Sequence, residues 1–265
     1  MDENMNSESS DAPKTASPIV ESPQMSEIGT LVNVFIEPEN TFKDIVRKPR
    51  WIIAGIIISL LVGVYALGLQ MKVGEAGMRS FIAEQVNKGF GADSMSAEQK
   101  AATVDMQVNI NRYTQYAVPI FVFISFFVGG FLYWIGSKAF GGTGGFFQNT
   151  SVWIYSSLPP TVVAMIANFI VLALKSADEI DLATSQRGLL QASPAFFIDG
   201  KAHPVISTFL STFDLFAIWG WILAAIGLSV VNKMSKGASW GLILVIVLIG
   251  LGFRLLSAVF SGNPA

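Results

Sequence analysis

Apolar residues in this chain gather in long runs with very few charges. Five runs reach the ~20 residues that a helix needs to cross the hydrocarbon core of a bilayer. They cover residues 51–70, 116–136, 152–174, 209–231 and 240–260. Within each run the apolar residues are continuous rather than spaced three or four apart, which indicates contact with lipid rather than with a soluble core. The pattern predicts an all-α, polytopic membrane bundle of about five transmembrane helices.

Short helices outside the spans are also expected. Residues 28–50 place apolar residues at helical spacing on one side and basic residues on the other. Such a segment lies in the membrane interface, where each basic residue adds about 1 kcal/mol on an anionic leaflet. The alternative is an amphipathic helix packed on a partner or on the bundle itself. The expected contacts with anionic lipid are Lys43, Arg47, Lys48 and Arg50.

The connections between spans differ in length and charge. Residues 71–115 are long and polar, and the capping-box sequence Ser96-Ala97-Glu98-Gln99 predicts a helix there, outside the membrane. Residues 175–208 form a second long, acidic connection. The Gly-rich stretch 141–145 is not followed by Lys-Ser or Lys-Thr, so we expect a flexible hinge rather than a phosphate-binding loop.

Charge gives an expected domain organisation and orientation. Residues 1–27 hold six acids against one lysine and predict a disordered, acidic tail in the cytosol, ahead of a membrane domain at 51–260. Basic residues cluster beside the first span and at the short connections, which places the amino terminus in the cytosol, both long connections outside and the carboxyl terminus outside. The absence of cysteine and the compact length suggest a bacterial inner membrane.

Composition excludes several kinds of chemistry. Hydrophobic residues make up 52% of the chain and charged residues only 14%, against roughly a quarter charged in soluble domains. Without cysteine there are no disulfides, thiolate metal sites or cysteine nucleophiles, and His203 is the single histidine. A net charge of −2 lacks the dense basic surface that nucleic-acid binding needs. We therefore expect no catalytic residues, cofactor, metal site or nucleic-acid partner.

Two ionisable residues fall inside the predicted spans. Asp214 lies 21 residues before, and Arg254 lies 19 residues after, the middle of the turn near Ser235. At a rise of about 1.5 Å per residue, two continuous helices would bring them to a similar depth. We expect a structural ion pair that closes the outer end of this hairpin. A proton relay, a solute site, or an arginine that reaches the interface unpaired are the alternatives.

Small residues recur every four positions on two of the spans. Gly55, Ser59 and Gly63 do so on the first, and Gly220 and Ala224 on the fourth. Small side chains at this spacing let helix backbones approach closely in lipid. We expect packing within the bundle, with homodimerisation as the alternative.

Two adjacent prolines, Pro159 and Pro160, interrupt the third run. They predict either a kink or the true start of the helix, in which case residues 152–158 lie along the membrane. Half-helices of the kind that build transporter sites are the sharper alternative.

Three segments together resemble the Yip domain family of multi-span membrane proteins, named for interaction with Ypt/Rab-type small GTPases. They are FIEPENTFKDIVRKPRW at 35–51, GGTGGFFQNTSVWIYSSLPP at 141–160 and FDLFAIWGWILAAIGLSVVNKMSKGASW at 213–240. The resemblance implies five spans, a cytosolic amino terminus and no catalytic residues. In eukaryotic members it implies vesicle trafficking with Rab partners, whereas bacterial-type members share the membrane domain without that machinery.

These observations favour a non-enzymatic membrane protein that organises the membrane or recruits a partner. Its expected partners are the lipid bilayer and an unidentified membrane or cytosolic protein, with a homo-oligomer as a further possibility. A small-solute permease or channel subunit is the main alternative, and an intramembrane enzyme is a distant third. A transporter would gather several buried polar residues near the middle of the membrane.

Overall fold

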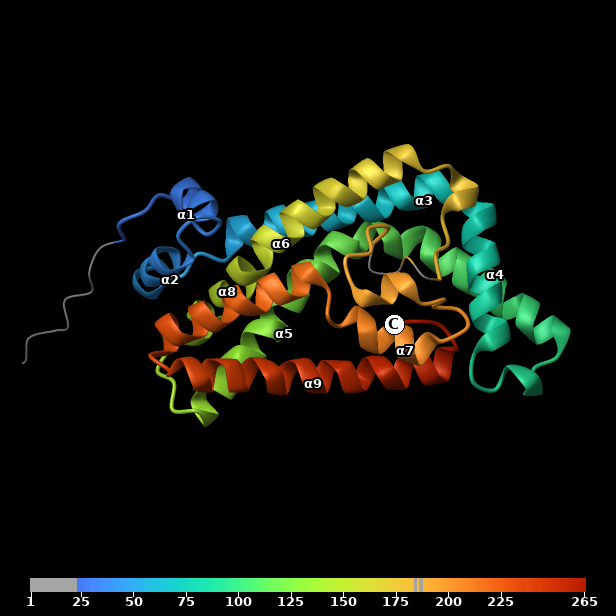
Figure 1. The fold of residues 1–265 in the computed structure, drawn as a ribbon. Helices are drawn as coiled ribbons and strands as arrows, with labels where there is room; N and C mark the ends of the chain where they lie inside the picture. The colour runs from blue at the N-terminus through green and yellow to red at the C-terminus, as the bar shows by residue number, and fades with distance from the viewer. Residues whose placement is uncertain (1–22, 184, 186–187) are drawn as a thin grey trace, which may run out of the picture.

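The computed structural model describes residues 23–183, 185 and 188–265, and helices dominate this part of the chain (Figure 1). Short 3-10 turns at Ala92–Ser94, Gln115–Ala117, Ala177–Glu179 and Pro194–Phe197 connect some of the helices. The α-helices are α1 (Glu27–Asn33), α2 (Pro38–Arg47), α3 (Ile52–Lys88), α4 (Ala97–Thr114), α5 (Val118–Ala139), α6 (Phe146–Leu174), α7 (Pro204–Ser211), α8 (Leu215–Asn232) and α9 (Lys236–Ser261).

Five of the helical segments are long and apolar enough to cross a membrane. They contain α3, α5, α6, α8 and α9, and α9 alone has 26 residues. This confirms the all-α membrane bundle expected from the sequence. The predicted disordered tail at 1–27 lies mostly outside the described residues, but Glu27 is already the first residue of α1 and is capped by Ser26.

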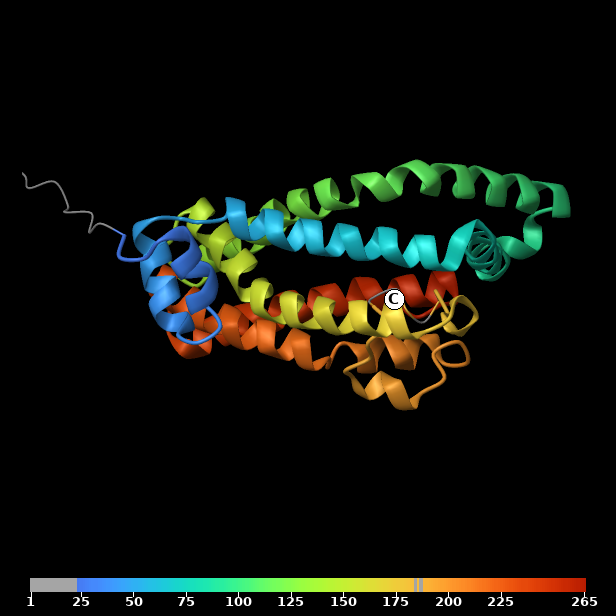
Figure 2. The same ribbon diagram turned by 90° about the horizontal axis from the view of Figure 1, so that it is seen from above.

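The five long helices run side by side along one axis (Figures 1 and 2). One end of the bundle, which we call the platform end, carries α1, α2, the 140–145 connection and the 233–235 turn between α8 and α9. The opposite end, which we call the loop end, carries the 175–203 connection and α7. Inside the bundle α6 packs against both α5 and α8, so it is the central helix.

The helix α3 changes direction at Gly74, whose φ of 72° and ψ of 178° are not helical. A glycine adopts this backbone conformation without steric cost. The apolar part, 52–73, lies in the bundle, and the polar part, 75–88, pairs with α4. Ile82 buries itself between them against Val104. The connection 71–115 is therefore a helical hairpin that continues directly from the first span.

The fourth predicted span, 209–231, is wrong at its start. Residues 204–211 form the separate helix α7, and α8 begins only at Leu215. The side chain of Asp214 marks this start, because its Oδ1 accepts the backbone N–H groups of Phe216 at 2.9 Å and Ala217 at 3.3 Å. Hydrophobicity alone does not separate two apolar helices, whereas a capping carboxylate does.

The third predicted span is also wrong at its start, but in the opposite sense, because it starts too late. The helix α6 begins at Phe146 and continues through Pro159 and Pro160, both of which are buried. The prolines therefore do not mark the beginning of the helix. One turn earlier, the hydroxyls of Ser156 and Ser157 donate to the carbonyl oxygen of Trp153 at 3.0 and 2.8 Å.

Candidate functional site

The helix α2 covers the platform end of the bundle with its apolar side. Phe42 and Ile45 are fully buried. A Cβ added to Gly227 of α8 would lie 2.9 Å from the ring of Phe42, and 2.7 Å from Val152 of α6. The alternative of a helix packed on the bundle therefore applies to α2, since its apolar side is already occupied.

The guanidinium of Arg50 lies inside this platform, with only 3% of the side chain exposed. Its Nη1 is 2.8 Å from Glu27 Oε1, and its Nη2 is 3.2 Å from Oδ2 of Asp44. The Asp44 side chain is itself 1% exposed, and its Oδ1 accepts the backbone N–H of Gln24 at 2.6 Å. Arg50 also donates to the carbonyl oxygen of Met25. The expected lipid contact is wrong for Arg50, because its charge holds α1 against α2.

The other basic residues of this segment lie nearer the surface. Lys43 is 2.7 Å from Glu39 one helical turn away, and Lys48 is 3.4 Å from Glu27. Arg47 lies in the last turn of α2. Their contact with anionic lipid stays a prediction, and Lys43 and Lys48 each already lie beside an acid of the same chain.

The helix α1 turns an apolar side outward. Ile28 and Val32 of α1 and Ile36 of the turn that follows this helix are 73%, 56% and 74% exposed, and they follow one another at four-residue spacing. On the opposite side Thr30 and Val34 are fully buried. α1 is thus packed on one side and bare on the other within the described structure.

The Gly-rich connection is fixed in place rather than acting as a flexible hinge. Asn149 of α6 and Asn232 of α8 exchange amide hydrogen bonds of 3.1 and 2.9 Å, and both are buried. The N–H of Gly144 donates to the same Asn232 oxygen at 3.2 Å, and the N–H of Thr143 donates to the Asn232 carbonyl at 3.1 Å. A Cβ at Gly144 would lie 2.5 Å from that amide oxygen, so only glycine fits here.

A hydrogen bond joins the first turn of α6 to α2, because Gln148 Nε2 donates to the carbonyl oxygen of Val46 at 2.7 Å. Aromatic rings gather at this level between the start of α3, α5 and α6. Trp51 stacks on Phe147 with ring centres 5.7 Å apart and packs edge-on against Phe127 at 5.2 Å. Such rings are typical of the interface between hydrocarbon and headgroups. Parts of the three segments 35–51, 141–160 and 213–240, which are distant in sequence, therefore meet at the platform end.

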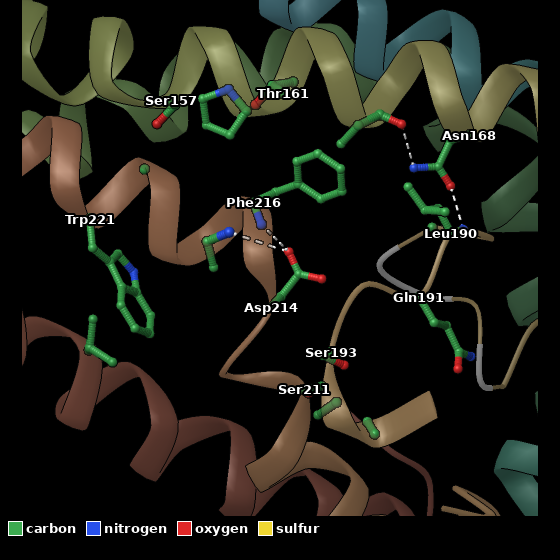
Figure 3. Close-up of a pocket in the computed structure, with 18 of the residues that line it drawn as sticks. Ser157, Thr161, Asn168, Leu190, Gln191, Ser193, Ser211, Asp214, Phe216 and Trp221 are labelled. Carbon is green, nitrogen blue, oxygen red and sulfur yellow. Dashed lines mark hydrogen bonds between the residues drawn. The ribbon is translucent and has the colours of Figure 1, made fainter. Parts of the chain in front are cut away.

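A cavity of about 600 Å³ lies between α6, α8 and α9 and continues under the 183–200 connection (Figure 3). Its wall on α6 extends from Trp153 to Asn168. Asn168 is buried, and its Oδ1 accepts the N–H of Leu190 at 2.9 Å, which ties the connection to α6. Gln191, Ser193 and Asp214 line the cavity toward the loop end.

The structure does not pair Asp214 with Arg254. Asp214 caps α8, as described above, whereas Arg254 donates to Thr212 Oγ1 at 2.9 Å and Ser211 Oγ at 2.6 Å. Its Nε also donates to a main-chain oxygen of Ala265 at 3.1 Å. The predicted ion pair assumed a continuous helix through residues 209–214, and the break between α7 and α8 removes that assumption.

The small residues of the first span face α5. A Cβ at Gly63 would lie 2.3 Å from Pro119 Cγ, and one at Gly55 would lie 3.0 Å from the ring of Phe123. Ser59, between them, is 3% exposed. These positions lie inside a helix–helix contact of the bundle.

The small residues of the fourth span face α6. A Cβ at Gly220 would lie 3.6 Å from the Ser156 carbonyl oxygen, and Ala224 is 1% exposed. A tighter approach, which the spacing pattern did not single out, joins α5 to α6. There a Cβ at Gly130 would lie 2.7 Å from the Cα of Thr150.

Comparison with known proteins identifies the family. The Yip1 domain family model matches residues 32–259, which include all of the platform except the start of α1. The chain belongs to the Yip1 domain family. Membrane protein YknW of Bacillus subtilis (strain 168) is 27% identical over 136 residues. That match covers 51% of this chain and 52% of YknW, so the chain spans about half the length of this curated relative. No solved structure matches significantly.

The resemblance read from three segments is thus confirmed, and this Yip1-family chain adds residues that the sequence pattern did not reveal. Asn149 and Asn232 join two of those segments, and Arg50 fastens the third. An available signal was the isolated asparagine in an apolar run, because a buried amide needs a partner. Over the described residues, no group of three or more His, Asp or Glu side chains is placed to hold a metal ion.

Proposed function

We propose that this Yip1-family protein is a non-enzymatic membrane organiser that recruits a protein partner through the exposed side of α1. In this proposal the platform end faces the cytosol of a bacterial cell and the loop end faces outside. The distribution of charge supports this orientation, since Lys138, Lys233 and Lys236 join the basic residues of α2 at the platform end. The loop end carries Asp178, Glu179, Asp181 and Asp199 in its long connection.

The single observation that carries the proposal is the two-sided environment of α1. Its inner side is held through Glu27 by the buried guanidinium of Arg50, while Ile28, Val32 and Ile36 stay exposed. Since α1 is already fixed, a partner that covers it does not have to order the helix on binding. Helices recognised in grooves present anchors at this four-residue spacing.

A protein partner fits this surface better than lipid does. α1 lies beyond the start of α3, at the platform end of the bundle (Figures 1 and 2). Trp51 stacks on Phe147 in a cluster of aromatic side chains, which is typical of the boundary between hydrocarbon and headgroups. In this proposal the exposed side of α1 therefore lies outside the hydrocarbon. Stable anchoring on anionic lipid needs basic charge next to the apolar side. Here Lys43 and Lys48 each lie within 4 Å of an acid of the same chain.

A cysteine-labelling experiment tests the proposal directly, because the chain contains no cysteine. A spin label at Val32→Cys in the purified protein, in lipid nanodiscs, should be reached by a water-soluble paramagnetic reagent rather than by oxygen dissolved in the bilayer. In native membranes a thiol-directed crosslinker at the same position should give one discrete protein adduct. The matched control is Lys43→Cys, which lies on the solvent side of α2 and should give none.

Further measurements show whether a protein partner, lipid or a second copy of the chain covers the exposed side of α1. The adduct should disappear in the Ile28→Glu, Ile36→Glu background if the apolar side is the contact. A label that lies among acyl chains, or an adduct at twice the mass of the chain, would overturn recruitment in favour of lipid anchoring or of a homo-oligomer.

The permease alternative is less well supported by the packing. Between the cavity and the platform end the bundle is filled by Val152 and Tyr155 of α6 and Leu228 of α8, each at most 1% exposed. Closer to the platform end, the hydrogen-bonded pair of Asn149 and Asn232 joins α6 to α8. The cavity is therefore closed toward the platform end.

A further inference from the structure

The cavity is long relative to its volume. Its wall on α6 runs from Trp153 to Asn168, which is roughly 22 Å at the helical rise of about 1.5 Å per residue. A volume of about 600 Å³ falls within the range of small-molecule sites in proteins. An elongated molecule fits these dimensions better than a compact one.

The deeper part of the cavity is apolar. Ile243, Ile246 and Val247 of α9 and Trp221 of α8 line it. The serines on the facing side of α6 add little polarity, because the hydroxyls of Ser156 and Ser157 already donate to a backbone carbonyl. This part therefore suits a hydrocarbon chain or ring.

The part nearer the loop end is acidic. Asp214 is the acidic side chain among the described lining residues. Its Oδ1 accepts two backbone N–H groups, whereas Oδ2 has no hydrogen bond within the described chain. Figure 3 shows this second oxygen on the open side of the carboxylate, below Phe216 and facing the side of Gln191 and Ser193.

The nearby positive charge does not neutralise this oxygen. The guanidinium of Arg254 is not part of the lining and donates to Ser211, Thr212 and a main-chain oxygen of Ala265. A carboxylate at membrane depth is costly unless a cation or water compensates it. The remaining acceptor at Asp214 Oδ2 thus selects a ligand that brings a positive charge or strong donors.

We infer that the cavity binds an amphipathic amine, with its ammonium group on Asp214 and its apolar body along α6 and α9. The same chemistry is found in a lipid with an amine headgroup and in a free amphiphilic amine. The inference does not depend on the partner of α1, because the cavity and the exposed side of α1 lie at different ends of the bundle.

Binding is measured on the full chain in phosphatidylcholine nanodiscs. The probe is a primary alkylammonium with a brominated 12-carbon chain, whose N–H donors the trimethylammonium headgroup of the host lipid lacks. The bromine quenches tryptophan fluorescence at short range, and Trp153 and Trp221 line the cavity. We expect a saturable quenching component above the linear background of partition into lipid. Trp221→Phe should remove a large part of that component.

The variant Asp214→Asn removes the charge and keeps the helix cap, since asparagine caps helices about as well as aspartate. We expect its Kd for the ammonium probe to rise by about tenfold or more. Asp178→Asn, which neutralises an acid outside the cavity lining, should leave the Kd unchanged. An unchanged Kd in Asp214→Asn would overturn the inference.

A charge series on the unaltered protein provides a second test that needs no variant. Alkyl sulfate of the same chain length should not displace the ammonium probe, and a neutral alcohol should displace it weakly. Equal displacement by all three would overturn the inference. Replacing part of the phosphatidylcholine with phosphatidylethanolamine identifies the source: competition indicates the lipid headgroup, and its absence indicates a free amine.

Discussion

The buried guanidinium of Arg50 gives the sharpest prediction for the platform. Arg50→Met removes the charge and keeps a side chain of similar length. It leaves the carboxylate of Asp44, which is 1% exposed, without its ion-pair partner. Removing one partner of a buried pair costs about 3–5 kcal/mol, because the remaining charge stays buried and uncompensated. The second contact, to the partly exposed Glu27, adds at most about 1 kcal/mol.

Most of this loss should appear as local opening of α1, because Arg50 and Asp44 hold the segment that leads into it. A loss of about 3 kcal/mol corresponds to an increase of roughly two orders of magnitude in the opening equilibrium. Hydrogen exchange of the backbone N–H groups of residues 27–34 should accelerate by that factor in detergent or nanodiscs. The long helices of the bundle should keep their exchange rates.

Two further variants test the burial of Arg50. Lys43→Met breaks an exposed pair on α2 and should change exchange by less than about threefold. Adding Asp44→Asn to Arg50→Met should recover part of the loss, because an amide costs less to bury than an unpaired carboxylate. If Arg50→Met and Lys43→Met behave alike, the assignment of Arg50 to the inside of the platform is wrong.

Two further predictions concern helix contact and pH. Gly130→Ala should lower the free energy of unfolding by about 1–3 kcal/mol, since the new Cβ would lie 2.7 Å from the Thr150 Cα, whereas Gly250→Ala has no neighbour within 4 Å and should be neutral or slightly stabilising; unfolding titrations in mixed micelles compare them. At the loop end, the hydrogen bond that Lys88 donates from one turn further along α3 lowers the pKa of Glu84, and Lys201 lowers it further. A carboxyl group whose pKa is lowered in the folded state stabilises the fold fully above its ordinary pKa of about 4.3. This stabilisation is lost as the pH falls through the pKa of the folded state. Exchange of backbone amides near Lys201 should therefore rise on acidification, and Glu84→Gln should abolish that pH dependence.

The number and nature of the spans were readable from the sequence, because lipid demands a continuous apolar surface over a fixed length. Apolar composition alone did not fix the residue at which each helix begins. The start of α8 is set by the cap at Asp214, and the start of α6 lies six residues before Val152, where Asn149 and Thr150 are buried by packing rather than by their own hydrophobicity.

The roles of single charged residues were not readable in the same way. Arg50 looks from the sequence like one more member of a basic cluster, yet it is the one whose partners, Asp44 and Glu27, enclose it. Asp214 and Arg254 seemed to match in depth, but the break before Leu215 gives each of them other partners.

The sequence by itself determined the family, the helical class and the five apolar spans, since these depend on local composition and on motif order along the chain. Only the tertiary structure decided which side of α1 stays exposed, how Asn149 meets Asn232, and where a cavity opens beside Asp214. The physical reason is that these features depend on the directions of side chains from helices that are distant in sequence, and a periodic pattern fixes the face of each helix but not its neighbour.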